Sequence, residues 1–359
     1  MSTLAAFQRS IPALPWAPIA VMVTVLVVLA VAGWEVRCRA WGYAPGLDDT
    51  RDLWVEQRRE VAPDDTVIIG TSRGLFGLDL DALEQGLGRR PKQLCLVGSC
   101  VYPILQNLAD DQSFHGTVLC DVVPSLLMVP FMAPPYHNSE KALERLRTQS
   151  PSQHWSHLLS QPLERTFACL QQEDLTLAAL LGGLPIPNRE HAQMGPALPP
   201  HFAIIDRDRR ARMRDRVLTD QTLRDRLKQG WIPLLTPPPQ PHWIPDAAFG
   251  AFMHNMVEER FAAMSAAVEA IRKRGGRVVF LRMPSTAELR VVEDRFSPRA
   301  AVWDRLLRDA QAPGIYADDH FELSRFDLPE WSHLSAADSV TFTRALVPYL
   351  QAVLGSAPH

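Results

Sequence analysis

The stretch TVIIGTSRGLFG, residues 66–77, decides the fold of this chain. Its apolar run, V-I-I, leads directly into a turn of small residues. A short continuous apolar run that ends in turn residues predicts a strand buried on both faces, as in a parallel sheet. The turn then presents a hydroxyl group at Ser72, followed by a positive charge at Arg73. The turn could therefore hold a nucleophile, bind a phosphate, or simply begin the next helix.

Similar apolar runs recur along the chain and alternate with helix-like segments. This alternation predicts an α/β fold, a three-layer sandwich in which helices cover both faces of a central, mainly parallel sheet. A serine at position 335 is a suitable N-cap for the last helix, which we expect to end near Leu354. The predicted strands are 66–70, 94–98, 117–123, 277–283 and 314–319, and the other predicted helices are 52–61, 78–88, 102–111, 259–276 and 299–312.

The predicted organisation has four parts. A tail (1–15) precedes a transmembrane anchor (16–35), a polar juxtamembrane segment (36–63) and an α/β domain (64–354). A proline-rich insertion at about 125–254 interrupts the domain, and we expect it to cover one end of the sheet. Within the insertion, residues 206–228 carry charges of both signs at helical spacing, which favours a solvated helix.

The segment Ala17–Trp34, APIAVMVTVLVVLAVAGW, carries no charge over 18 residues and has Trp16 and Trp34 at its ends. Its length and its flanking tryptophans favour an uncleaved single-pass anchor. A cleaved signal peptide is the alternative, but its apolar region is usually shorter and no clear cleavage site follows. One arginine precedes the span and three follow it closely, a count that by the positive-inside rule places the domain in the cytoplasm.

Composition narrows the class of partner. The chain has 359 residues, 47% of them hydrophobic, and a formal net charge of −3, so we expect no nucleic-acid partner. The five cysteines have no zinc-binding spacing, and the histidines have no spacing typical of metal ligands. The sequence therefore indicates neither a metal nor another cofactor.

The turn after the first strand has two alternatives to a nucleophile. Gly70, Gly74 and Gly77 resemble a phosphate-binding turn, and Arg73 would favour an anion. Their spacing, however, matches neither the dinucleotide fingerprint nor the P-loop. The second alternative is structural, with glycines that permit positive φ and with Ser72 as the cap of the next helix.

The nucleophile interpretation draws on the other end of the chain. In PEWSHLSAADSV, residues 329–340, Glu330 precedes His333 by three positions. A serine becomes nucleophilic when a base accepts its proton, and the base must be oriented by an acceptor on its other nitrogen. A loop before the last helix can reach the edge of the sheet where the first strand ends, which is where sites form in open α/β sheets. Ser72, His333 and Glu330 are therefore the candidate catalytic residues.

Three motifs in this order resemble the SGNH (GDSL-like) hydrolase superfamily. GTSR (70–73) looks like its Gly-Asp-Ser block, Gly98 in LVGSC like its second-block glycine, and EWSH (330–333) like its Asp-x-x-His block. The resemblance covers residues 64–123 and 277–350 and implies a flavodoxin-like, five-stranded sheet. It also implies an oxyanion hole formed by the backbone amides of Ser72 and Gly98. Arg73 and Arg282 are the candidate substrate-binding residues.

The chain departs from the family pattern at three positions. Thr71 replaces the usual acidic residue and Glu330 replaces the aspartate, so Asp327 or the Asp318–Asp319 pair is an alternative partner for His333. The Gly-x-Asn block is missing, because the third strand ends in CDVVPS (120–125) without an asparagine. Arg73 or a residue of the insertion is the candidate replacement. Loss of one oxyanion donor typically costs about 2.7–4 kcal/mol of transition-state stabilisation.

The resemblance implies a membrane-anchored acyl esterase or O-acyltransferase that acts on an acylated carbohydrate, an envelope polymer or a similar small-molecule ester. Anchored members of the superfamily often work in the bacterial cell envelope beside membrane-bound O-acyltransferases, in polysaccharide modification. By that analogy we expect the bacterial inner (cytoplasmic) membrane and a periplasmic or extracellular domain, against the charge count. The alternative is a catalytically weakened member that serves as a binding or assembly component of an envelope polysaccharide system.

Overall fold

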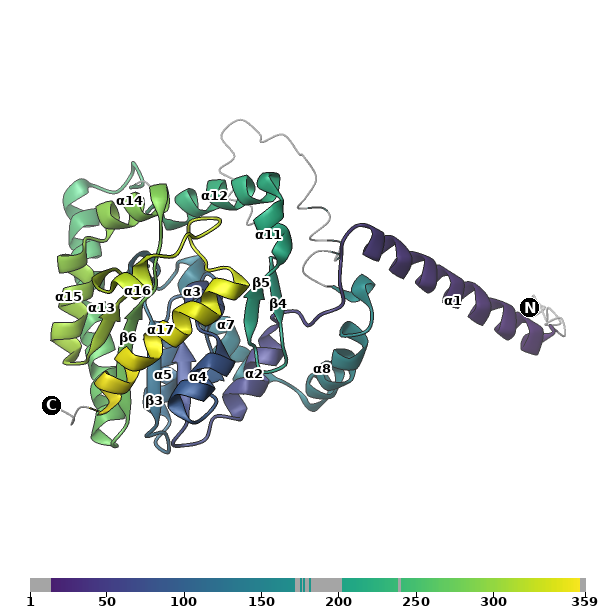
Figure 1. The fold of residues 1–359 in the computed structure, drawn as a ribbon, viewed down its shortest axis with the longest axis horizontal. Coiled ribbons are helices and arrows are strands. Elements are labelled where there is room, and N and C mark those ends of the chain that lie inside the picture. Colours follow the sequence, from purple (N-terminus) through teal and green to yellow (C-terminus); the bar gives the residue numbers. More distant parts are fainter. Residues whose placement is uncertain are drawn as a thin grey trace, which may run out of the picture.

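The computed structural model describes residues 14–171, 175, 177, 181, 202–237 and 240–355. Most of the predicted tail and the part of the insertion between 182 and 201 lie outside the described residues. The described chain contains an α/β domain and a long helix that projects from it (Figure 1).

The five-stranded sheet confirms the predicted fold class. Its strands are β1 (Thr66–Ile69), β2 (Lys92–Gln93), β3 (Thr117–Asp121), β6 (Arg277–Arg282) and β7 (Gly314–Tyr316). They are all parallel and lie in the order β2-β1-β3-β6-β7, the flavodoxin-like order. The chain crosses from β2 on one side of β1 to β3 on the other, so the end of β1 is the topological switch point. This is the position at which such sheets form their sites.

Two hydrophobic clusters fill the two faces of the sheet. Side chains alternate between them along each strand, so Ile68 packs in one cluster while Val67 and Ile69 pack in the other. The first face is covered by α3 (Ser72–Gly77), α4 (Leu80–Leu87), α14 (Ala287–Phe296) and α17 (Ala336–Gly355). The second is covered by α2 (Arg51–Arg59), α5 (Tyr102–Asp110), α7 (Pro134–Thr148), α13 (Asp246–Lys273) and α15 (Arg299–Ala310). Short segments complete this part: α6 (Pro124–Leu127), η2 (Ala317–Asp319) and α16 (Phe321–Ser324).

The bounds of two elements differ from those predicted from the sequence. The second strand, predicted at 94–98, is assigned to β2 at Lys92–Gln93, although the amides of Leu94 and Leu96 continue the ladder by donating to the carbonyl groups of Ile68 and Gly70. The helix predicted at 259–276 begins much earlier, at Asp246. The predicted cap of the last helix is confirmed, because the Ser335 hydroxyl accepts from the Asp338 amide.

The N-terminal helix α1 (Trp16–Ala40) is long and apolar enough to span a membrane. It has 25 residues, and the apolar window, of mean hydropathy 2.4, has no buried residue. The predicted juxtamembrane segment, by contrast, belongs partly to the domain. Trp54 on α2 is fully buried, and its indole N–H donates to the carbonyl group of Leu94.

The insertion is largely ordered secondary structure where the structure describes it. It includes α8 (Pro151–Glu164), η1 (Ala168–Leu170), the antiparallel hairpin β4 (Ala203–Ile205) and β5 (Ala211–Met213), α11 (Asp215–Thr219) and α12 (Gln221–Leu235). The single solvated helix predicted at 206–228 is therefore wrong. One reason is Arg209, which is fully buried: its guanidinium group pairs with Asp49 at 2.7 Å and donates to the Gln93 and Cys95 carbonyl groups.

Candidate active site

The turn after β1 is shaped by its contact with the end of β3. Gly70 has φ of +147°, and a Cβ atom there would lie 2.5 Å from the Cβ atom of Asp121. Only glycine fits this close approach. Thr71 is the N-cap of α3, and its hydroxyl accepts from the amide of Arg73. Ser72 is thereby fixed at the first position of α3, at the carboxyl edge of the sheet.

Ser72 and His333 meet at this edge. The Ser72 Oγ atom lies 2.8 Å from His333 Nε2, although the two residues are 261 positions apart in the chain. On the other side of the ring, His333 Nδ1 lies 3.0 Å from Glu330 Oε1. An ionised carboxylate only accepts hydrogen bonds, so we assign the proton to Nδ1, which leaves the Nε2 lone pair facing the serine. The predicted proximity of hydroxyl and imidazole is confirmed.

Hydrogen bonds within the loop and contacts with two other segments hold the loop that carries His333. The Glu330 carboxylate accepts from the His333 amide at 2.5 Å as well as from the ring. Trp331, between them, has φ of +76°, a conformation that costs energy for a residue other than glycine. Its carbonyl group accepts from the Thr286 amide, and the Lys228 ammonium lies over its ring. The surrounding contacts therefore fix the short acid–base loop.

Glu330, not its predicted alternatives, is the partner of the histidine. Asp327 is exposed, while Asp318 pairs with Arg290 and Asp319 with Arg299. Glu330 is fully buried, and its second oxygen accepts from the indole N–H of Trp231. Both carboxylate oxygens therefore have partners.

Aromatic side chains enclose the imidazole of His333, which is 1% exposed. The rings of Phe76, Phe202 and Trp231 lie with their centroids 5.0, 5.4 and 5.3 Å from that of His333. Phe202 and Trp231 belong to the insertion, and sequence reasoning did not select them. Nothing in their local sequence indicates that they contact a loop more than 95 residues further along the chain.

The two arginines predicted to bind substrate are buried in ion pairs. Arg73 and Arg282 are both 3% exposed, and both guanidinium groups pair with the carboxylate of Glu293 on α14. Arg73 also donates to the hydroxyl of Ser332, the neighbour of His333. Burial alone would raise the pKa of Glu293, but the Arg282 and Arg73 charges outweigh it and hold that pKa well below its ordinary value. This burial contradicts a substrate-binding role and removes Arg73 as a cation for a phosphate or an oxyanion.

Asp121 occupies the end of β3, where the family pattern has its asparagine block. It is fully buried, and its Oδ2 atom accepts from the Thr71 amide at 3.1 Å, the Thr71 hydroxyl at 2.9 Å and the Gly74 amide at 3.0 Å. The carboxyl group therefore fixes the backbone of the turn on both sides of Ser72. A charged residue at the end of a buried strand was the signal in the sequence that could have identified it.

Burial raises the pKa of Asp121, and the hydrogen bonds from Thr71 and Gly74 only partly oppose this effect. An aspartate whose pKa is raised on folding stabilises the fold most below its unfolded pKa, and that contribution is lost as the pH rises through the folded value.

The side chain introduced by Asp121→Asn would stay neutral at every pH, whereas the parent loses stability as Asp121 ionises. We therefore expect the melting temperature of Asp121→Asn minus that of the parent to become more positive from about pH 4 to about pH 8. Thermal unfolding in one detergent at both pH values measures this gain. Asp225→Asn, at an exposed position of α12, is the control. A difference for Asp121→Asn that does not change with pH would contradict the expectation.

Gly98 lies in a turn at the same edge of the sheet, with φ of +59°. The ladder bond from Leu96 to the Gly70 carbonyl group places the segment before Gly98 beside the serine turn. Its role as an oxyanion donor, like that of the Ser72 amide, stays a prediction. Among the described residues, no group of three His, Cys, Asp or Glu side chains is placed to hold a metal ion.

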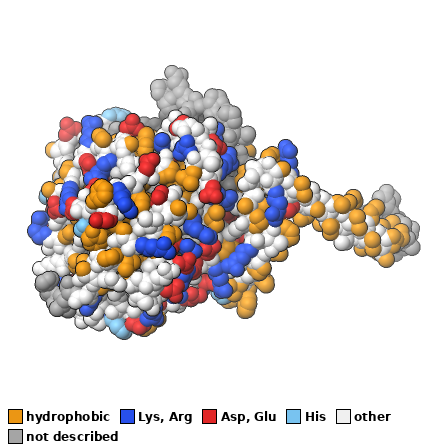
Figure 2. Space-filling model, in the orientation of Figure 1, with side chains coloured by type: hydrophobic (Ala, Val, Ile, Leu, Met, Phe, Trp, Pro, Cys, Tyr) orange, Lys and Arg blue, Asp and Glu red, His pale blue; other side chains and the backbone are white. Residues whose placement is uncertain are grey.

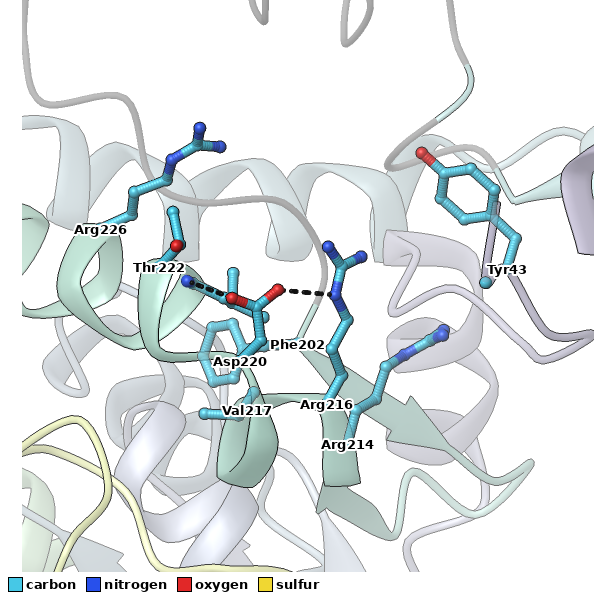
Figure 3. Close-up of a pocket in the computed structure, with 10 residues that line it drawn as sticks. Tyr43, Phe202, Arg214, Arg216, Val217, Asp220, Thr222 and Arg226 are labelled. Atoms are coloured by element: carbon cyan, nitrogen blue, oxygen red, sulfur yellow. Dashed lines mark hydrogen bonds and ion pairs between the residues drawn. The ribbon is translucent and has the colours of Figure 1, made fainter. Parts of the chain in front are cut away.

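A pocket of about 210 Å³ shares a wall with the site (Figure 3). Phe202 lines the pocket and also contacts His333. Figure 3 shows Arg214 and Arg216 between Arg226 on α12 and Tyr43 on the opposite side. The other described lining residues are Gly42, Val217, Asp220, Thr222 and Leu223, and Asp220 pairs with Arg216.

No family model matches this chain, and no curated protein matches its sequence.

Proposed function

We propose that this chain is a membrane-anchored serine acyl esterase or O-acyltransferase. One observation carries the proposal: the hydrogen-bonded series from the Ser72 hydroxyl through the His333 imidazole to the Glu330 carboxylate. A hydroxyl that meets an unprotonated imidazole nitrogen, with an acid on the far nitrogen, is the arrangement that activates a serine for acyl transfer.

In the first half of the reaction, the Ser72 Oγ atom attacks the carbonyl carbon of an ester while His333 Nε2 takes the hydroxyl proton. The imidazolium ion then gives that proton to the departing alcohol as the carbon–oxygen bond breaks, and an acyl-serine remains. Glu330 stabilises the positive charge on the ring. The buried aromatic surroundings strengthen this interaction, because they exclude water.

In the second half, an acceptor hydroxyl attacks the acyl-serine, with His333 as base and then as acid. Water as acceptor gives hydrolysis, and a sugar hydroxyl gives transfer. We propose an acylated carbohydrate or a similar ester of the bacterial envelope as the substrate and a membrane-bound O-acyltransferase as a candidate partner. We also propose the inner membrane as the location, with the domain outside the cytoplasm. These assignments rest on the resemblance of GTSR, Gly98 and EWSH to the SGNH hydrolases.

Covalent labelling of the full-length protein in detergent with a fluorophosphonate tests the proposal. We expect one adduct, which peptide mass spectrometry locates on Ser72. Folded protein that takes up no label would favour the alternative, a binding or assembly component without catalysis.

We further propose that the arginine-lined pocket accepts an anionic group of the substrate. The pocket adjoins the imidazole through Phe202, and the exposed side chain of Arg226 on α12 lines it. An exposed charge pair contributes up to about 1 kcal/mol, a few-fold in rate or affinity.

Arg226→Ala should therefore lower the preference for p-nitrophenyl hydrogen succinate over p-nitrophenyl acetate, measured as a ratio of kcat/KM values, by about two- to fivefold. Arg147→Ala, an exposed arginine on α7, is the matched control and should leave the ratio unchanged. An equal loss for both esters, or no loss for either, would contradict the anion-binding role.

A further inference from the structure

An apolar stripe on α8 has no partner among the described residues of the chain. Trp155, Leu159 and Leu163 follow one another at intervals of four and are 60%, 69% and 51% exposed. Residues at this spacing share one face of a helix. Leu170, on the neighbouring η1, is also exposed. Large apolar side chains gathered on one helix face are typical of a surface that contacts something other than water.

The opposite side of α8 is held on the domain. His157 Nε2 lies 3.1 Å from Glu56 Oε2 on α2, and the side-chain amide of Gln161 donates to the same oxygen at 2.8 Å. Arg207 also pairs with Glu56. These contacts hold the side of α8 that faces the domain, so the apolar stripe on the opposite side points outward.

The end of α8 is joined to the exit of the candidate membrane span. The Glu35 carboxylate on α1 accepts from the amides of Ala168 at 3.0 Å and Cys169 at 2.9 Å, and Arg39 donates to the carbonyl group of Thr166. Glu35 directly follows the apolar segment and Trp34, a residue type common at the membrane interface. The segment after α8 therefore lies at the level where α1 leaves the hydrocarbon.

The direction of α8 relative to α1 also favours a position of α8 at the membrane surface. Figure 1 shows α8 at the end of the domain from which α1 projects, running across the direction of α1. Figure 2 shows hydrophobic side chains on this edge of the domain. If α1 crosses the bilayer, α8 lies along the bilayer surface. An amphipathic helix with a tryptophan and leucines on its outer face is suited to that position.

We propose that α8 is a second membrane contact, which lies in the interface of the bilayer through Trp155, Leu159 and Leu163. The occupant of this surface is the lipid itself. Exposed basic residues at the same level, Arg39 and Arg165, suit anionic headgroups. The proposal depends on α1 as a span and is independent of the chemistry of Ser72.

Photo-crosslinking of the full-length protein in nanodiscs of phosphatidylethanolamine and phosphatidylglycerol tests the contact. A p-benzoylphenylalanine residue in place of Leu159 should form lipid adducts, detected by mass spectrometry, in at least about tenfold higher yield than the same residue in place of Val291. Val291 is 67% exposed and lies on α14, which Figure 1 places away from α1. Comparable yields at the two positions, or a cross-link from position 159 to a second copy of the chain, would overturn the proposal.

Tryptophan quenching by brominated lipids gives a second measurement that needs no unnatural residue. Trp155→Phe should lower the quenched fraction of the fluorescence, and Trp243→Phe, at a position 73% exposed, should not. A quenched fraction that is unchanged in Trp155→Phe would also overturn the proposal.

Discussion

Ser72→Ala is expected to abolish fluorophosphonate labelling and to lower ester turnover by at least about 10³-fold. The hydroxyl that lies 2.8 Å from the imidazole is the only atom of the side chain that can form the acyl intermediate. His333→Ala should cost a similar factor, and combining the two should add little, because residues that act as one unit are not additive. Turnover of a chromogenic ester and the rate of labelling measure both effects.

Ser324→Ala is the matched control, because it removes a partly buried hydroxyl on α16, outside the site. It should keep the parent rate. Labelling or turnover that survives in Ser72→Ala would end the proposed mechanism, whatever the control shows.

The second large effect is expected from Glu293→Gln. The substitution leaves the buried guanidinium groups of Arg73 and Arg282 without their anion. Breaking a buried ion pair by removing one partner typically costs about 3–5 kcal/mol, which corresponds to a fall in melting temperature on the order of 10 °C. Arg73 follows Ser72 and contacts Ser332 beside His333, so we expect the labelling rate to fall as well. Thermal unfolding and labelling of the same preparation measure both.

The depressed pKa of Glu293 sets the pH range of this effect. A carboxyl group with a lowered pKa contributes stability above its ordinary pKa and loses it as the pH falls through the folded value. The deficit of Glu293→Gln should therefore be full at neutral pH and diminish only in strong acid. Glu288→Gln, at an exposed position on the same helix, should change stability by less than about 0.5 kcal/mol. A deficit of equal size in Glu288→Gln would point to the helix itself and not to the buried charges.

The fold could be predicted from the sequence because its signals are local. Strands buried on both faces are short apolar runs. Gly70 and Thr71 follow β1, and Gly275 and Gly276 precede β6. The serine and histidine loops could be found for the same reason, since each is a short motif at the end of an element. Their meeting followed from a property of parallel sheets, which gather the carboxyl ends of strands at one edge.

The contacts that complete the site could not be predicted, because they join segments far apart in the chain. The partner of Arg73 is 220 positions away on α14, and the indole that binds Glu330 lies 99 positions before it. From the sequence alone, a charged residue such as Arg209 is expected to be exposed to solvent. Its burial depends on partners far away in the chain, Asp49 and two backbone carbonyl groups. For this reason the sequence predicts one helix over 206–228, whereas β5, α11 and the first half of α12 occupy most of that stretch.

The hydrogen bonds between Glu35 and the segment after α8 have a mechanical consequence. A domain joined to its membrane helix by a flexible peptide can take up many heights above the membrane. Here these hydrogen bonds join α1 directly to the domain, so if α1 spans a bilayer, Ser72 is held at one constant height above it.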